Sequence, residues 1–220
     1  MCNIKFTRIF QKALYSLVFM LFFAPSSSFA QALEDTLRAA LEGDLVTLQK
    51  LLDRGTSPDT TDAEGNTLLM LAARGGHVKV AQLLVSRKAS VTQKSKVGDT
   101  ALMAAALKGE IPMAAFLLEQ GAELNPAGWA PLHYAAFEGR AQMITFLIGK
   151  GANKDAPAPN EFTALMLAVR GGFEDATRSM LYADPDVNYK THGGDTALKL
   201  ASQKGYAPMV ELLKRAGATE

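Results

Sequence analysis

Apolar and polar residues follow one another along the chain in blocks that recur about every 33 positions. Each block begins with a polar, glycine-containing stretch and continues into an apolar run such as Thr67 to Ala73 or Thr100 to Ala106. A glycine follows this run, and a second apolar segment comes after it. A threonine before an apolar run and a glycine behind it are typical helix boundaries, so the pattern predicts two short helices in each block.

The glycines that separate the two predicted helices set the register of the repeat. They lie 33, 33, 30, 33 and 33 residues apart, at Gly43, Gly76, Gly109, Gly139, Gly172 and Gly205. A fixed period of this length is the signature of stacked repeats, in which each unit hides its apolar face against its neighbour. The sequence therefore predicts an elongated array of about six units.

The segments before these glycines carry a recognisable motif. Gly-Asp-Thr-Ala-Leu-Met-Ala (98 to 104) and Gly-Trp-Ala-Pro-Leu-His-Tyr (128 to 134) resemble the ankyrin motif Gly-x-Thr-Pro-Leu-His-x-Ala-Ala. The resemblance covers residues 31 to 220 and implies a mainly α ankyrin-repeat solenoid of helix-turn-helix units with short projecting hairpin fingers. The expected units are residues 31–63, 64–96, 97–126, 127–159, 160–192 and 193–220.

Two features of the motif have a direct physical reading. Threonine hydroxyls can cap the first helix of a unit, each contributing on the order of 1 kcal/mol; the candidates are Thr67, Thr100, Thr163 and Thr196. In the fourth unit Ala130 lacks the hydroxyl, but Pro131 suits the first helical position. The small Ala-Ala pair that follows lets the helices of neighbouring units approach closely.

Two units depart from the pattern. The connection from Glu123 to Ala127 is three residues shorter than its counterparts, so we expect a stunted finger, and Pro157 and Pro159 disfavour regular hairpin pairing in the next one. The fifth unit has Asp184-Pro185 where the others have Gly-Ala or Lys-Ala, and Ser179 in an otherwise apolar column. We therefore expect the fifth unit to form the least stable interface.

The first thirty residues have the three-part layout of a secretory signal peptide. Lys5, Arg8 and Lys12 form a basic start, an apolar run ends at Ala24, and small residues precede a cut after Ala30. The alternative is an uncleaved anchor, but the apolar run is shorter than the roughly 20 residues that cross a bilayer. The sequence therefore predicts a signal peptide at residues 1–30, no stable membrane anchor after cleavage, and a periplasmic or secreted protein of the bacterial exported type.

Composition limits the chemistry of the mature chain. The single cysteine, Cys2, lies in the predicted signal peptide, so residues 31–220 can form neither a disulfide nor a thiolate metal site. The mature chain carries 20 Lys and Arg against 22 Asp and Glu, a formal charge of −2 that favours no nucleic acid. We expect a monomer that binds another protein and has no cofactor.

Candidate catalytic and metal-binding residues are sparse. His77, His133 and His192 are isolated from other ligands, and no Gly-x-Ser-x-Gly nucleophile elbow occurs. The resemblance implies that His133 hydrogen-bonds the backbone of its own motif. Met70, Met103 and Met166 share one repeat column, and their spacing indicates packing between first helices. The sequence therefore predicts no catalytic, cofactor or metal site.

Ankyrin proteins bind partners through finger tips and the concave face of the first helices, and the resemblance transfers two columns to this chain. The column after the motif glycine contains Trp129 and Phe162, and the column after Ala-Ala contains Leu107 and Phe137. Large aromatic residues dominate interface hot spots, so we expect these four residues at the centre of a protein-binding patch. Its expected rim is Arg74, Asp99, Lys108, Glu138 and Arg170. The alternative is that Trp129 and Phe162 fold down onto the fingers as packing.

The predicted function is a noncatalytic interaction module or scaffold in the periplasm or outside the cell, and not an enzyme. Two alternatives stay open: a secreted effector directed at a host protein, and an immunity or inhibitor protein for an exported enzyme. The sequence shows neither an additional secretion tail, which would favour the effector, nor an acidic plug, which would favour the inhibitor.

Overall fold

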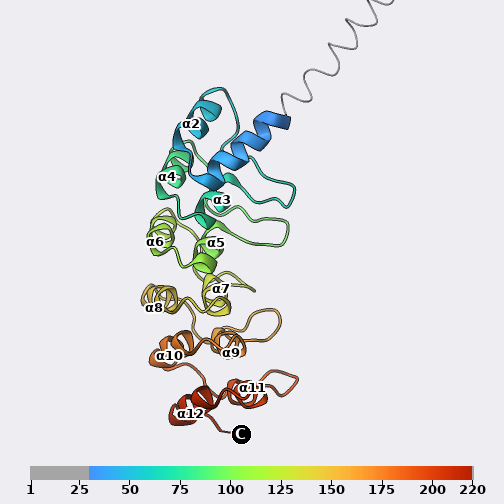
Figure 1. Ribbon diagram of the computed structural model, residues 1–220, viewed down its shortest axis with the longest axis vertical. Coiled ribbons are helices and arrows are strands. Elements are labelled where there is room, and N and C mark those ends of the chain that lie inside the picture. Colours follow the sequence, from blue (N-terminus) through green and yellow to red (C-terminus); the bar gives the residue numbers. More distant parts are fainter. Residues whose placement is uncertain (1–29, 220) are drawn as a thin grey trace, which may run out of the picture.

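The computed structural model describes residues 30–219, and the predicted signal peptide apart from Ala30 lies outside the described residues. Short helices follow one another in pairs down a single stack (Figure 1). A helix over residues 30–42 pairs with α2 (Leu45–Asp53) in the first unit. The later pairs are α3 (Leu68–Arg74) with α4 (Val78–Ser86), α5 (Ala101–Lys108) with α6 (Ile111–Glu119), α7 (Pro131–Phe137) with α8 (Ala141–Gly149), α9 (Ala164–Arg170) with α10 (Glu174–Tyr182), and α11 (Ala197–Lys204) with α12 (Ala207–Arg215).

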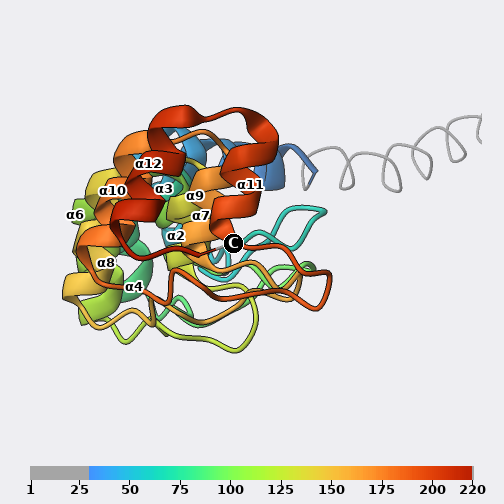
Figure 2. The same cartoon turned by 90° about the horizontal axis from the view of Figure 1, so that it is seen from below.

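The pairs form two helical layers and a set of projecting loops. First helices pack on first helices, as α5 does between α3 and α7, and second helices pack on second helices, as α10 does between α8 and α12. Viewed along the stack, the loops between units extend from the helical layers to one side (Figure 2). Within residues 30–219, six stacked helix pairs confirm the predicted solenoid and the register set by the glycines.

The predicted threonine caps are confirmed at the starts of α3, α5, α9 and α11. The hydroxyl oxygen of Thr67 accepts a hydrogen bond from the Met70 amide at 3.2 Å, and Thr196 accepts one from Lys199 at 3.1 Å. Thr100 and Thr163 cap in the same way at 3.3 Å. In the fourth unit the imidazole of His133 takes a different role, because its Nδ1 accepts from the Ala130 amide at 3.0 Å.

The core runs the length of the stack as a series of columns. The Ala-Ala pairs of the first four units are buried, and the fifth unit has a buried Ala168-Val169 pair in the same place. Another column, the third residue of each first helix, holds Met70, Met103, His133 and Met166, all buried between first helices. In the last unit this column holds Lys199, which is exposed and pairs with Asp195 at 2.9 Å. The lysine fits there because no further described unit covers that face.

The turn between the two helices of a unit depends on glycine. Gly139 has φ 68°, a conformation that side chains with a Cβ rarely adopt, and an added Cβ would lie 2.5 Å from the Phe173 ring. Phe173 precedes α10 in the next unit, so it occupies the space that the missing side chain leaves. The turn glycine therefore serves both the local bend and the packing between units.

The fingers are loops closed by tight turns. The Asp62 amide donates to the Asn66 carbonyl at 3.0 Å, and the same closing bond recurs from Ser95 to Asp99, Ala158 to Phe162 and Thr191 to Asp195. Within residues 30–219, one isolated antiparallel bridge, from Thr61 to Thr67, is all the β-pairing present. The hairpin fingers are therefore held mainly by their turns.

In the first, third, fourth and fifth units, an Asp or Asn side chain ties the finger base to the next unit. The carboxylate of Asp59 accepts from the Ser90 amide at 2.7 Å, and Asp155 accepts from Asp186 at 2.8 Å. Asn125 and Asn188 bond across the units with both ends of their amides. These bonds join residues about one repeat apart, so they fix the spacing of neighbouring fingers.

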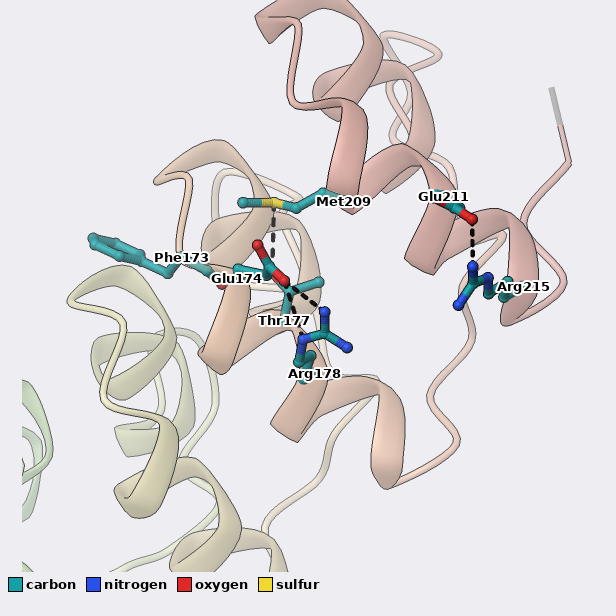
Figure 3. A network of polar contacts seen from close by, with 7 residues as sticks. All are labelled: Phe173, Glu174, Thr177, Arg178, Met209, Glu211 and Arg215. Atoms are coloured by element: carbon teal, nitrogen blue, oxygen red, sulfur yellow. Dashed lines mark hydrogen bonds and ion pairs between the residues drawn. The ribbon is translucent and has the colours of Figure 1, made fainter.

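The fifth unit is held by more polar contacts than its neighbours. Thr177 is buried on α10, where its hydroxyl donates to the Phe173 carbonyl at 2.8 Å and faces the sulfur of Met209 on α12 (Figure 3). Asp184 follows α10 with φ 53°, and the Lys154 ammonium donates to the carbonyls of Ala183 and Asp184. A charged side chain from the previous finger thus caps the carboxyl end of α10.

Candidate functional site

The two columns singled out from the sequence lie on the first helices and at the finger ends. Trp129 and Phe162 immediately precede the capping positions of α7 and α9, at the point where a finger returns to the helical layer. Leu107 and Phe137 lie in the last turns of α5 and α7. The helix starts that fix these positions are set locally, so the sequence places the columns reliably.

Trp129 packs against its own first helix. Its ring meets the His133 imidazole edge-on, with centroids 5.8 Å apart, and meets the Tyr134 ring at 5.9 Å. The indole is half-buried by these contacts and packs on the core. One side of the ring is therefore packing, and the rest of it lies at the surface.

Tyr134 joins two units and was missed from the sequence. Its hydroxyl donates to the carboxylate of Asp99, which lies one unit earlier in the stack. Burial raises the pKa of Tyr134, and the hydrogen bond and charge of Asp99 raise it further, so the phenol stays protonated. The sequence feature that could have indicated this contact is the hydroxyl of Tyr134 in a repeat column that elsewhere holds apolar residues: Leu71, Ala104, Leu167 and Leu200.

His133 is fully enclosed between fingers and helices. While Nδ1 accepts from Ala130, Nε2 lies 2.9 Å from the Ala156 carbonyl in the next finger, so the proton resides on Nε2. Burial lowers the pKa of His133, and the bond to Ala156 opposes that effect. A neutral imidazole with both nitrogens occupied has a structural role, and the predicted backbone bond is confirmed.

Phe162 is covered by a cation. The guanidinium carbon of Arg170 lies 5.1 Å from the centre of the Phe162 ring, within range of a cation–π contact in the same unit. Phe162 is half-buried, and Arg170 is exposed. Within residues 30–219, no stacked or edge-on pair joins the Phe162 and Trp129 rings, so the two aromatic residues contribute separate contacts.

Among the first helices of the described units, Phe137 is the most exposed large apolar side chain, at 47% of its full surface. Leu107, one unit earlier, is half-buried and lines a shallow hollow of about 20 Å³. The other walls of the hollow include Arg74, Asp99, Met103 and Tyr134. Part of the predicted centre and part of its predicted rim therefore lie around one depression.

The predicted rim residues differ in how far they are already paired. Arg74 and Lys108 are exposed and make no ion pair within residues 30–219. Glu138 lies 3.6 Å from Arg140, whose Nε donates to the Leu107 carbonyl at 3.1 Å. Asp99 is engaged by Tyr134. The unpaired charges of this surface are mainly positive.

Other kinds of site find little support in the described chain. Residues 30–219 contain no group of three or more His, Asp or Glu side chains close enough to hold a metal ion. Among the same residues, no helix combines the length and apolar character needed to cross a membrane. What the structure offers is a surface for contact, formed by aromatic, aliphatic and basic side chains.

Known proteins with related sequences also carry ankyrin repeats. Human ankyrin repeat and KH domain-containing protein 1 is 37% identical over 89 residues, which are 40% of this chain and 4% of that protein. Human photoreceptor ankyrin repeat protein is 36% identical over 96 residues, 42% of this chain and 20% of that protein. The chain therefore spans only a small part of the length of these relatives.

Among solved structures, the ankyrin repeat domain of human ASB11 superposes with a TM-score of 0.76 at 26% identity, covering 84% of each chain. The family description "Ankyrin repeats (3 copies)" matches residues 37–127, 88–158 and 132–219 in overlapping segments. Those segments span nearly all of the described helices, and the chain therefore belongs to the ankyrin-repeat family.

Proposed function

We propose that this chain is a noncatalytic module that binds another protein through the concave surface of its first helices and fingers. Ankyrin repeats indicate a protein–protein interaction module, and proteins built of them generally have no catalytic role. The observation that carries the proposal is Phe137, which leaves nearly half of a large apolar surface in water beside Leu107. An exposed aromatic residue next to an aliphatic one is typical of interface anchors.

The proposed binding patch has Trp129, Phe162, Phe137 and Leu107 at its centre. Its rim comprises Arg74, Asp99, Lys108, Glu138 and Arg170. Trp129 and Phe162 each keep part of the ring at the surface while the rest is held by His133, Tyr134 or Arg170. Rings held in this way lose little side-chain freedom on binding, which favours them as contact residues.

Crosslinking and pulldown with the mature chain would identify the partner, and titration with that partner would test the patch. We expect replacing both Trp129 and Phe162 by alanine to weaken binding by at least about thirtyfold, the equivalent of roughly 2 kcal/mol. Tyr182→Ala is the matched control, because this aromatic side chain is 93% exposed on α10, in the second-helix layer. Unchanged affinity of a folded double variant would refute the patch.

We further propose that residues 1–30 are a cleaved signal peptide and that the mature chain acts as a monomer in the periplasm or outside the cell. The basic start, the apolar run and the small residues before Gln31 support export, and the cysteine-free mature chain suits an oxidising compartment. Fractionation of a bacterial host and amino-terminal sequencing should find Gln31 at the start of a periplasmic protein. A cytoplasmic chain that retains Met1 would contradict export.

A further inference from the structure

The ends of the first helices form a patterned column. From the first unit to the sixth, the column reads Leu41, Arg74, Leu107, Phe137, Arg170 and Gln203. Two apolar residues in consecutive units are thus bracketed by one arginine on each side. This order of side chains indicates the chemistry of the partner, an inference that rests on the proposed function.

The bracketing arginines differ from most others in the described chain. Five of the eight arginines in residues 30–219 form ion pairs with carboxylates: Arg38, Arg87, Arg140, Arg178 and Arg215. Arg74 and Arg170 are exposed and have no such pair within that range. Their guanidinium groups are therefore available to a carboxylate from outside the chain.

The two arginines have different surroundings. Asp99 shares the shallow hollow with Arg74, but its carboxylate accepts from the Tyr134 hydroxyl instead. Arg170 lies over the Phe162 ring, 5.1 Å from its centre. A guanidinium held on an aromatic face can still direct its N–H groups at a planar carboxylate, so Arg170 is oriented before a partner arrives.

The surroundings of the column carry charges of both signs. The residues that follow the column positions are Glu42, Gly75, Lys108, Glu138, Gly171 and Lys204. Together with Arg74, Arg170 and the Asp99 carboxylate near Arg74 they carry four positive and three negative charges, and the negative charge of Glu138 is partly neutralised by Arg140 at 3.6 Å. A basic strip on a mature chain of formal charge −2 attracts acidic rather than basic partners.

The spacing sets the length of the complementary segment. Arg74 and Arg170 are three units apart, or about 27 Å if neighbouring helices pack about 9 Å apart. An extended chain covers that span with about eight residues at about 3.3 Å each. We propose that this column binds an extended segment of another protein that has carboxylates at both ends and apolar side chains between them.

Selection from a random 12-residue peptide library, displayed on phage, tests the proposal with the folded mature chain. We expect the selected peptides to carry Asp or Glu on both sides of an apolar centre. Arg74→Gln and Arg170→Gln should each lower the affinity for the best synthetic peptide about five- to tenfold, and this loss of affinity should be smaller at high salt. Arg54→Gln is the matched control, because Arg54 is also exposed and unpaired within residues 30–219 but follows α2 rather than a first helix.

The outcomes separate this inference from the proposed function. Selected peptides that are apolar without flanking acids, and that bind both glutamine variants normally, would overturn the inference and leave the binding patch standing. Peptides that bind the Trp129 and Phe162 double-alanine variant as well as the native chain would overturn the patch itself. A selection that enriches no sequence would count against both.

Discussion

The fourth and fifth units follow the same backbone plan with different side chains. On the second helix of the fourth unit, α8, Ile144 is fully buried, and the matching position of α10 in the fifth unit holds Thr177, which is buried just as completely. A residue in the left-handed conformation follows the second helix of each of these units. It is Gly151 with φ 93° in the fourth unit and Asp184 with φ 53° in the fifth. Both positions of the fifth unit are chemically less favourable than those of the fourth.

The fifth unit compensates with hydrogen bonds. Thr177 satisfies its hydroxyl on the Phe173 carbonyl, and Lys154 reaches from the preceding finger to the carbonyls after α10. At these two positions, hydrophobic burial and a glycine stabilise the fourth unit, whereas polar contacts of smaller net value act in the fifth. The comparison supports the expectation that the fifth unit forms the weaker interface, which stays a prediction.

The largest expected change in stability comes from replacing the buried Ile144 of α8 by alanine, and the matching change on α10 is Thr177→Ala. Ile144→Ala should lower the free energy of unfolding by about 3 kcal/mol, because it leaves a cavity. Thr177→Ala should lower it by less than about 1 kcal/mol, since alanine favours the helix and the lost hydroxyl was bonded within it. Urea unfolding followed by circular dichroism measures both changes. Equal losses for the two variants would contradict the difference between the units.

A smaller effect is expected from exchanging the left-handed residues. Asp184→Gly should raise the free energy of unfolding by about 1 kcal/mol, and the reverse change Gly151→Asp should lower it by about as much. A Cβ added at Gly151 would meet no atom within 4 Å, so backbone strain is the main cost of the change. Thermal denaturation of the two variants would check the signs. A destabilised Asp184→Gly protein would show that the aspartate side chain matters more than its backbone conformation.

The smallest expected effect is a change in pH dependence at the fourth unit. Burial lowers the folded pKa of His133 below its unfolded value of 6.5, so the unfolded chain binds the proton more readily. This contribution to stability is present above the unfolded pKa and is lost as pH falls through the folded pKa. His133→Met, which copies Met166 of the fifth unit, should flatten the loss of stability between neutral and mildly acidic pH. Denaturant titrations at several pH values would measure the free energy of unfolding of both proteins. The same loss of stability at acidic pH in the variant and the native chain would contradict the role of His133.

Most of the fold was predictable because its determinants are local and repeated. The period of the turn glycines, the threonine caps and the apolar columns each appear several times, so every unit supports the interpretation of the others. The positions of Trp129 and Phe137 on the stack followed from the same register. Their surroundings did not, because the orientation of a ring depends on side chains that meet it only after stacking.

Several contacts of the candidate site could not be predicted for the same reason. Tyr134 reaches Asp99 across 35 residues, and Lys154 reaches the end of α10 across about 30. Arg170 covers Phe162 within one unit, but the rotamer of so long a side chain is set by the side chains that surround it after folding. These contacts decide which predicted rim residues remain available to a partner.

The sequence by itself determined the number, order and register of the helical units, because capping, turn formation and apolar periodicity act between residues close in the chain. The tertiary structure decided which side chains of the first helices and finger ends are packed, paired or exposed. Those outcomes depend on contacts between residues about one repeat apart, where the approach of neighbouring units selects one set of partners. Asp99 bonded to Tyr134 and Arg74 left unpaired beside it are the clearest result of that selection.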